Sequence, residues 1–244
     1  MGRPVVARLV EAGHDVREVG RSPGRLAEVA AEAEVVVVCV FDDEQVRQVC
    51  LDGTLLATMA PGSARVVHTT VSPLTIEAIA ARAADGGVDV VDAPVSGGPQ
   101  DAATGSLTLF VGGADETVAR LQPVLGCYGD PVLHVRPSGA GQKLKLINNA
   151  LFAGQIGLLG ECVRFGERLG LPESTLLAAL RHGSAVSRGL ELVARHGSVA
   201  SFTEARGEFL GKDVAVIRGV AGELGCDLGV LDDVIKGIDV RDRV

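Results

Sequence analysis

Apolar residues in the first 137 positions alternate between strand-like and helix-like spacing. A run of β-branched residues, VVVVCV at 35–40, is typical of a strand that is buried on both faces. Further strands are predicted at 15–19, 65–69, 88–93, 106–113 and 131–135. Helices are predicted between them at 3–12, 24–33, 43–58, 73–85 and 115–126. This alternation predicts a mostly parallel sheet covered by helices on both faces.

The pattern changes after Pro137, where no strand-like segment follows. One long helical pattern spans 139–169. Shorter helices are predicted at 173–181, 188–196, 205–223 and 230–237. We therefore expect an α/β domain at 1–137 and an all-α domain at 138–244. A doubly wound domain that binds a dinucleotide begins with a strand and a glycine-rich turn, but this sequence begins at the helix, so the first strand is missing from the pattern.

Composition narrows the kind of core and the kind of partner. The sequence is 47% hydrophobic but only 3% aromatic, and 32 of its 244 residues are glycine, so the core must be aliphatic. A formal net charge of −8 argues against nucleic acid or an anionic membrane as partner. No uninterrupted run of about 18 apolar residues occurs, so we expect no membrane span.

Cysteine and histidine usage gives no sign of a disulfide framework or a metal site. The cysteines are odd in number, scattered and without a CxxC pair, which favours reduced thiols and the cytoplasm. The five histidines share no ligand spacing, so no metal is expected.

The segment VDAPVSGGP at 91–99 is the first candidate for chemistry. Asp92 ends a predicted strand, and Ser96, Gly97 and Gly98 follow with a hydroxyl and unhindered backbone N–H groups. Such a loop at the carboxyl edge of a parallel sheet suits a carboxylate or another small anion. An ordinary glycine turn is the alternative.

The second candidate is SGAGQKLKLINN at 138–149. Gly139 and Gly141 allow a ligand or another backbone to approach the start of the long helix. Lys145 and Asn149 are four residues apart and share a helical face. A lysine on a buried face has a pKa lowered towards the working pH, as a general acid or base requires. The alternative is a helix whose lysines all extend into water.

Three further positions suggest cofactor contacts. Arg21 and Ser22 follow the second-strand position, where an arginine accommodates the 2′-phosphate of NADP, although surface arginines are common in loops. Thr70 closes the strand at 65–69 and could hydrogen-bond a cofactor ribose or amide. Lys212 is followed by an aspartate on a late helix, and the sequence alone favours a surface ion pair between these two residues.

The order of these segments resembles the β-hydroxyacid dehydrogenases, the group that contains 3-hydroxyisobutyrate dehydrogenase and tartronate semialdehyde reductase. The matching segments run from residue 1 to about 214: MGRPVVARLVEAGHDV, FDDEQV, TTVSP, DAPVSGGPQDAATGSLTLFVGG, GAGQKLKLINN and LGKDV. The resemblance implies a Rossmann-like domain joined by a long helix to an all-α domain that forms homo-oligomers. It also implies a small carboxylate substrate and NADP or NAD as cofactor.

The resemblance further implies roles for individual residues. Lys145 matches the catalytic lysine that exchanges a proton with the substrate oxygen, and Asn149 matches the asparagine beside it. The loop of Ser96, Gly97 and Gly98 matches the loop that binds the substrate carboxylate. Cofactor contacts are implied for Gly2, Thr70 and Lys212.

The sequence departs from the family where a GxGxMG turn precedes the first helix, since only Met1 and Gly2 of that turn are present. Either Met1 is an internal methionine of a longer protein, or the chain is a remodelled relative; we expect the 244-residue form to bind cofactor weakly. The leading hypothesis is an NAD(P)-dependent enzyme that interconverts a small 3-hydroxy acid and its semialdehyde or keto form. The alternatives are a non-catalytic oligomerising relative and a relative of the imine reductases.

Overall fold

The computed structural model describes residues 1–20, 23–53 and 55–236. The chain divides into two compact units, Met1–Lys145 and Leu146–Val244. The division falls inside the long helix α8 (Ala140–Arg168), which contributes its first turns to the first unit. The change in sequence pattern at 137 lies just before this helix begins.

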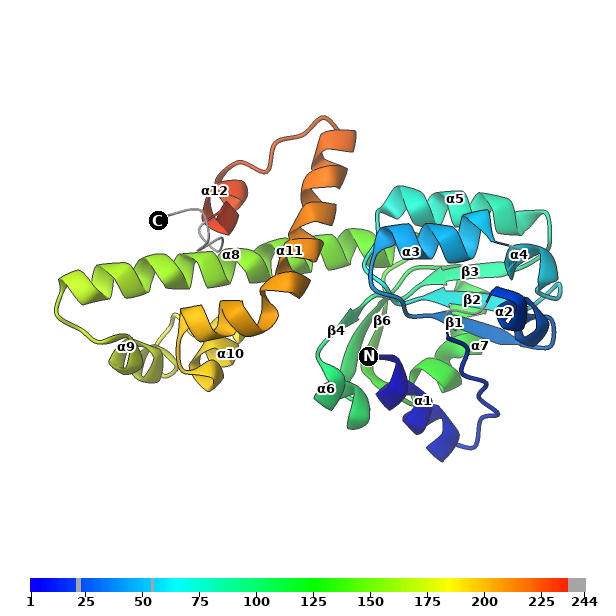
Figure 1. Cartoon of the computed structure of the whole chain (residues 1–244), viewed down its shortest axis with the longest axis horizontal. Coiled ribbons are helices and arrows are strands. Elements are labelled where there is room, and N and C mark those ends of the chain that lie inside the picture. Colours follow the sequence, from blue (N-terminus) through cyan, green and yellow to red (C-terminus); the bar gives the residue numbers. More distant parts are fainter. Residues whose placement is uncertain (21–22, 54, 237–244) are drawn as a thin grey trace. The chain divides into compact units, whose positions relative to one another are not determined.

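The first unit contains two connected three-stranded sheets (Figure 1). In the first sheet, β1 (Val35–Val38), β2 (Ala64–Val67) and β3 (Asp89–Asp92) are parallel and lie in that order. In the second, β5 (Leu107–Val111) pairs with β4 (Val95–Ser96) antiparallel and with β6 (Gly129–His134) parallel. A single bridge between Asp92 and Gly112 joins β3 to the end of β5. The mostly parallel sheet predicted from the sequence is confirmed.

Helices cover both faces of these sheets (Figure 1). One face carries α1 (Gly2–Glu11), α6 (Pro99–Ala103) and α7 (Asp115–Leu125). The other carries α2 (Pro23–Ala30), α3 (Asp43–Arg47), the π-helix η1 (Gln48–Asp52), α4 (Leu55–Thr58) and α5 (Pro73–Ala84). The cores on both faces are almost entirely aliphatic, as the composition predicts. This is the α/β, Rossmann-like arrangement that the sequence predicts.

The strand predicted at 15–19 is wrong, because this segment has no regular structure. Val16 and Val19 are only partly buried, and the intervening Arg17 is exposed and paired with Glu32 at 2.6 Å. A strand needs a hydrogen-bonded neighbour, and among the described strands β1 pairs only with β2. The apolar alternation of the segment alone is therefore not sufficient to make it a strand.

The second unit is all-helical, as predicted. It comprises most of α8, α9 (Glu173–Leu180), α10 (Arg188–His196), α11 (Val199–Glu223) and α12 (Val230–Lys236). Helix α11 begins six residues before the predicted position, because the Ser198 side chain caps it by accepting a hydrogen bond from the Ser201 N–H.

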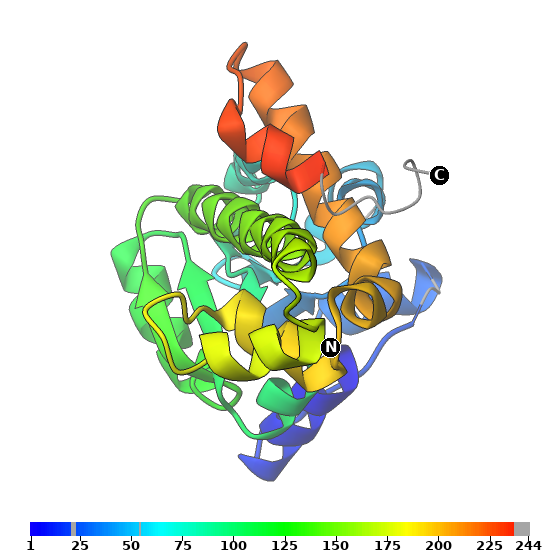
Figure 2. The same cartoon turned by 90° about the vertical axis from the view of Figure 1, so that its left-hand side faces the viewer.

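Small residues on α8 allow its neighbours to approach closely. Figures 1 and 2 show α12 on one side of α8 and α9 with α10 on the other. A Cβ added at Gly157 would overlap the Val234 carbonyl of α12, and one at Gly166 would overlap Leu176 of α9. Glycine in mid-helix costs about 1 kcal/mol relative to alanine, and here it permits this close packing.

Helix α8 also has the length and composition of a membrane span, alone among the described helices. Half of its most apolar stretch is buried inside the protein. Core helices of soluble proteins share these properties, so length and composition do not establish a span.

Candidate active site

The buried carboxylate of Asp92 joins the end of β3 to the start of α8. Its Oδ1 accepts the Gly139 N–H at 2.6 Å, and its Oδ2 accepts the Gln142 N–H at 2.8 Å. Burial raises the pKa of Asp92 to about 6, although the backbone N–H donors act in the opposite direction. Above that pH a negative charge therefore lies at the positive N-terminus of α8, where it is favourable.

Glycines make this junction possible. A Cβ added at Gly141 would overlap the Phe110 carbonyl oxygen and lie 2.8 Å from Asp92 Oδ2. A Cβ at Gly112 would overlap Asp92 Oδ1 and lie 2.7 Å from the Pro137 carbonyl oxygen. The sequence left open whether Gly141 admits a ligand or another backbone, and in the structure it admits backbone.

The side chain of Gln142 holds the loop that contains Thr70. The fully buried Gln142 amide donates to the Thr69 carbonyl at 2.9 Å and accepts the Val71 N–H at 3.0 Å. The Thr69 hydroxyl bonds both the carbonyl and the N–H of Val40, which follows β1. Thr70 itself is buried at the carboxyl edge of the sheet, where ligands of this fold class bind.

A second buried pair, His68 and Tyr128, holds the chain just before the Ser96 loop. His68 Nδ1 lies 2.6 Å from the Ala93 carbonyl oxygen, and its Nε2 lies 2.9 Å from the Tyr128 hydroxyl. Burial lowers the pKa of His68 to about 4, against the effect of the Ala93 carbonyl, so the ring is neutral at pH 7. Nδ1 then donates to Ala93, and Nε2 accepts from Tyr128.

The Ser96 loop is anchored by its own hydrogen bonds. Ser96 is partly buried in β4 and pairs with Thr108, while Gly97 has a φ of +130°. The Gly98 N–H donates to Asp101 Oδ2 at 2.6 Å. The expectation that all backbone N–H groups here are unhindered is therefore not met at Gly98, because that group stabilises the start of α6.

Lys145 and Asn149 lie on the buried face of α8, with exposed fractions of 8% and 7%. Asn149 donates to Asp213 Oδ2 at 2.8 Å, and Lys212 Nζ lies 2.8 Å from Asp213 Oδ1. Asp213 therefore connects two residues that the sequence proposed separately. The Lys212 and Asp213 side chains are 16% and 23% exposed, so this pair is partly buried.

The remaining predicted cofactor positions lie near the N-terminus. Gly2 begins α1, and the space around it is open, which leaves room for phosphate oxygens at this helix end. Arg21 and Ser22 lie outside the described residues. The backbone N–H groups at the start of α1 and the hydroxyl of Thr70 are thus suitable hydrogen-bond donors for a dinucleotide.

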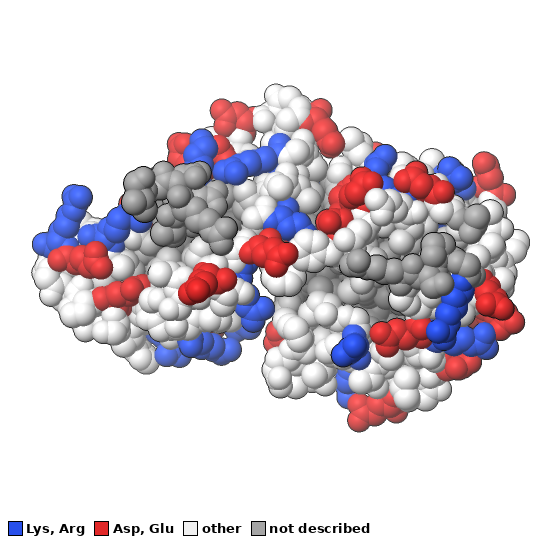
Figure 3. All heavy atoms as spheres, viewed as in Figure 1, with Lys and Arg blue, Asp and Glu red and all other residues white. Residues whose placement is uncertain are grey.

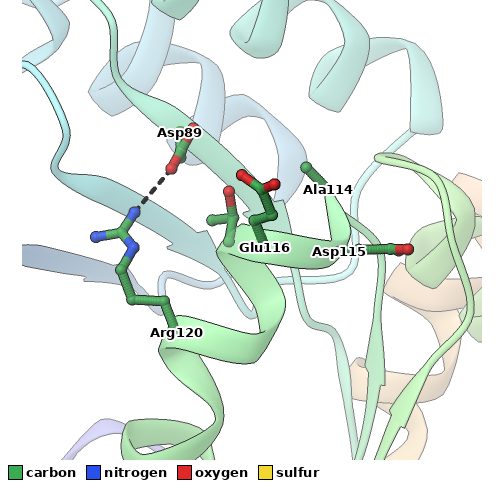
Figure 4. Close-up of a pocket in the computed structure, with 6 residues that line it drawn as sticks. Asp89, Ala114, Asp115, Glu116 and Arg120 are labelled. Atoms are coloured by element: carbon green, nitrogen blue, oxygen red, sulfur yellow. Dashed lines mark hydrogen bonds and ion pairs between the residues drawn. The ribbon is translucent and has the colours of Figure 1, made fainter.

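A depression elsewhere in the first unit does not coincide with these residues. It lies beside the N-terminus of α7 and is lined by Asp89, Ala114, Asp115, Glu116, Thr117 and Arg120 (Figure 4). Arg120 pairs with Asp89 at 2.7 Å, so the basic side chain of this depression already has a partner. Figure 3 shows acidic and basic side chains interspersed over the visible face, with like charges gathered only in small groups.

Sequence reasoning missed Gln142, His68 and Tyr128, and it treated Asp92 only as the end of a strand. Their partners lie 25 to 73 positions away in the sequence, so no local spacing reveals the contacts. The only available signal is a polar residue in an otherwise apolar or glycine-rich segment.

Two family models cover most of the chain. Residues 21–136 match the NAD-binding domain of 6-phosphogluconate dehydrogenase. Residues 139–236 match the NAD-binding domain of NADP-dependent 3-hydroxyisobutyrate dehydrogenase. The first unit thus carries an NAD(P)-binding domain.

Individual relatives agree with these models. The NAD-dependent L-serine dehydrogenase of Pseudomonas aeruginosa is 32% identical over 79% of this chain and 70% of its own length. The 2-(hydroxymethyl)glutarate dehydrogenase of Eubacterium barkeri is 29% identical over 78% of this chain and 68% of its own. The solved structure of Mycobacterium tuberculosis 3-hydroxyisobutyrate dehydrogenase with L-serine has a TM-score of 0.83 and 27% identity, covering 97% of this chain and 88% of that one.

The fold and the sequence similarity together define an NAD(P)-binding oxidoreductase scaffold. The chain belongs to the β-hydroxyacid dehydrogenase family. It spans 61% of the length of one curated relative that it matches and 71% of the length of another.

Proposed function

We propose that the protein is an NAD(P)-dependent dehydrogenase that interconverts a small 3-hydroxy acid and its semialdehyde or keto form. One observation carries the proposal. Lys145 is buried one helical turn after Gln142, whose N–H is bound to Asp92, and the loop to Ser96 leaves the sheet at Asp92. The helix that carries Lys145 and the loop that carries Ser96 are thus both anchored at Asp92, an arrangement that suits a proton-exchanging group and a carboxylate-binding loop acting on one small molecule.

The chain's own residues perform the binding and the proton transfer. The Ser96 hydroxyl and the Gly97 N–H hold the substrate carboxylate, while Gly98, whose own N–H donates to Asp101, continues the loop into α6. In the oxidation, Lys145 Nζ takes the proton from the substrate hydroxyl. At the same time the C–H bond of the carbon that bears this hydroxyl breaks, and its hydrogen leaves as hydride. Asn149 orients the substrate hydroxyl, and its own position is fixed by Asp213.

The cofactor, when bound, supplies the nicotinamide that accepts or donates the hydride. Thr70, Lys212 and the start of α1 at Gly2 are the residues proposed to hold it. Arg21 and Ser22 favour NADP over NAD, because an arginine at this position pairs with the 2′-phosphate.

Substrates with a hydroxyl on the third carbon are favoured by the family relationship. The relatives act on L-serine or 2-(hydroxymethyl)glutarate by their names, and the similar solved structure contains L-serine. In each of these molecules the oxidisable carbon is separated from a carboxylate by one carbon. A fixed distance between the Ser96 loop and Lys145 would select that spacing.

Turnover of matched substrates by the purified full chain tests the proposal. 3-Hydroxyisobutyrate and L-serine are compared with L-lactate, whose hydroxyl is one carbon closer to the carboxylate, each with saturating NADP⁺ or NAD⁺. We expect kcat/KM at least about tenfold higher for a 3-hydroxy acid than for L-lactate, and higher with NADP⁺. If no reduced cofactor forms with any of these substrates, the result would instead support the hypothesis of a non-catalytic oligomerising relative.

We also propose a homo-oligomer that forms through the helical unit. Four apolar side chains on one stripe of α8 are each more than half exposed, namely Ile147, Leu151, Leu158 and Phe165, and the equally exposed Leu169 follows directly after the helix. They lie within a narrow range of helical angle, opposite to the buried Lys145. A contiguous apolar stripe of this kind suits a second copy of the same helix.

Placing charge on the stripe should dissociate the oligomer. We expect the double substitution Leu158→Glu and Phe165→Glu to lower the particle mass measured by sedimentation, because each buried apolar side chain contributes about 2 kcal/mol per copy. Leu224→Glu, at a leucine outside the stripe that is even more exposed, serves as the control and should leave the mass unchanged. An unchanged mass in the double variant would exclude this stripe as the interface.

A cytoplasmic location is proposed on the state of the thiols. All five cysteines are free in the structure, and Cys50 is buried like a small apolar residue. Free thiols persist in a reducing compartment.

A further inference from the structure

The first turn of α8 is bound to the sheet edge from two directions. Asp92 accepts the backbone N–H of Gly139, immediately before the helix, at 2.6 Å and that of Gln142, in its first turn, at 2.8 Å. The Gln142 side chain bonds the Thr69 carbonyl and the Val71 N–H, on either side of Thr70. These four hydrogen bonds join the start of α8 to the end of β3 and to the loop that contains Thr70, and we call them the α8 clamp.

Each part of the clamp leads directly to a proposed site residue. Lys145 follows Gln142 by three positions, so its Cα lies about 4.5 Å further along the helix axis. Thr70 lies between the two residues that Gln142 bonds. Ser96 follows Asp92 by four positions, in the short strand β4.

The clamp is stiff because its groups are buried and its space is full. Asp92 and Gln142 are fully buried, so breaking any of their hydrogen bonds leaves a polar group without water. Bonds from N–H donors to a carboxylate are about twice as strong as neutral ones. No side chain fits at Gly141 or Gly112, so the backbone around the carboxylate has no room to shift.

We propose that Asp92 and Gln142 are positioning residues, which hold Lys145 and Thr70 in fixed places relative to the Ser96 loop through the α8 clamp. The proposal rests on the proposed function, because it concerns the geometry of that reaction. Neither side chain needs to touch substrate or cofactor. Their contribution is made through the backbone of one helical turn and one loop.

Substitution Asp92→Asn tests the clamp with little change in shape. One carboxylate oxygen becomes an NH2 group that faces a backbone N–H, so one of the two bonds to α8 is lost. We expect kcat to fall about 10- to 100-fold, since small misplacements of a reacting group have effects of this size, while the KM of the hydroxy acid changes less than about threefold. Asp89→Asn, at the opposite end of the same strand, is the matched control and should leave kcat unchanged.

A double variant separates positioning from a general loss of structure. If Asp92 acts through Lys145, Asp92→Asn should lower kcat less than about threefold in a Lys145→Ala background. If the two losses multiply in full, Asp92 acts independently of Lys145 and the proposal is overturned. The same reasoning applies to Gln142→Met, which keeps the side-chain length but removes both amide bonds, and provides a second test if Asp92→Asn does not fold.

A chemical measurement tests the clamp without any turnover. Limited acetylation by acetic anhydride, read by mass spectrometry, gives the labelling rate of Lys145 relative to the exposed Lys143 two residues earlier. We expect this ratio to rise at least about threefold in Asp92→Asn and in Gln142→Met, because a released turn exposes the buried amine. An unchanged ratio in both folded variants would refute the clamp. An inactive wild-type chain would refute the proposed function, but the ratio would still report on the clamp.

Discussion

Replacing Lys145 by alanine is expected to lower kcat by about three orders of magnitude while the protein stays folded. General acid–base catalysis by a positioned side chain contributes between about 10² and 10⁴ in rate. Lys145 is buried on the face of α8 that also carries Asn149, and no water-exposed amine of the same helix can replace it there. The measurement is steady-state turnover of the best 3-hydroxy acid, together with the melting temperature of the variant.

Lys143→Ala is the matched control for this substitution. Lys143 lies on the same helix, but its side chain is 59% exposed and pairs with Glu77 at 3.6 Å. Its removal should change kcat less than about twofold, because surface ion pairs contribute little. Partial recovery of Lys145→Ala by added primary amines would identify the missing group as a proton carrier. A Lys145→Ala enzyme that retains more than about a tenth of wild-type kcat would remove this lysine from the mechanism.

Acidification is expected to destabilise the fold through His68. The pKa of His68 is lowered from about 6.5 to about 4 by burial, so the unfolded chain binds this proton more tightly than the folded protein. The stabilisation by the neutral ring is complete above about pH 6.5 and is lost as the pH falls from 6.5 to 4. Its size is on the order of 3 kcal/mol.

The variant His68→Asn isolates this contribution. Its amide reproduces the donor to the Ala93 carbonyl but does not titrate.

The contribution of Asp92 to stability has the opposite dependence on pH, because its raised pKa of about 6 makes this contribution largest below pH 4 and smaller as the pH rises to 6. Since both proteins contain Asp92, its contribution cancels when their free energies of unfolding in urea are subtracted. That difference should shift in favour of the variant by a few kcal/mol between pH 6.5 and 4. A difference that is independent of pH would mean that His68 is not held neutral.

Much of the architecture follows from the apolar pattern. The valine-rich strand at 35–40, the long helix at 139–169 and the all-helical second part are confirmed, because apolar periodicity reports directly on burial. The segment 15–19 has the alternation of a strand but no hydrogen-bonded neighbour, and pairing is not encoded locally. The two-residue strand at Val95–Ser96 is too short to produce a period at all.

The candidate site is only partly visible in the sequence. Glycines beside a serine or before a lysine indicate a loop or a helix start, so Ser96 and Lys145 are recognisable as candidates. The partners of Asp92 and Gln142 come from segments about 50 to 70 positions away. Contacts of this kind depend on how the sheet edge and the helix meet, which no single stretch of sequence contains.

The crowding around Gly112 and Gly141 has a consequence for protein engineering. At Gly141 the obstructing atom is the Phe110 carbonyl oxygen, so no side-chain rotation could accommodate even a methyl group. In a saturation mutagenesis screen that selects only for folded protein, and not for activity, both positions would therefore tolerate no substitution. A library designed to alter substrate choice should keep these two glycines and diversify the more accessible residues near Ser96, such as Val95 and Gln100.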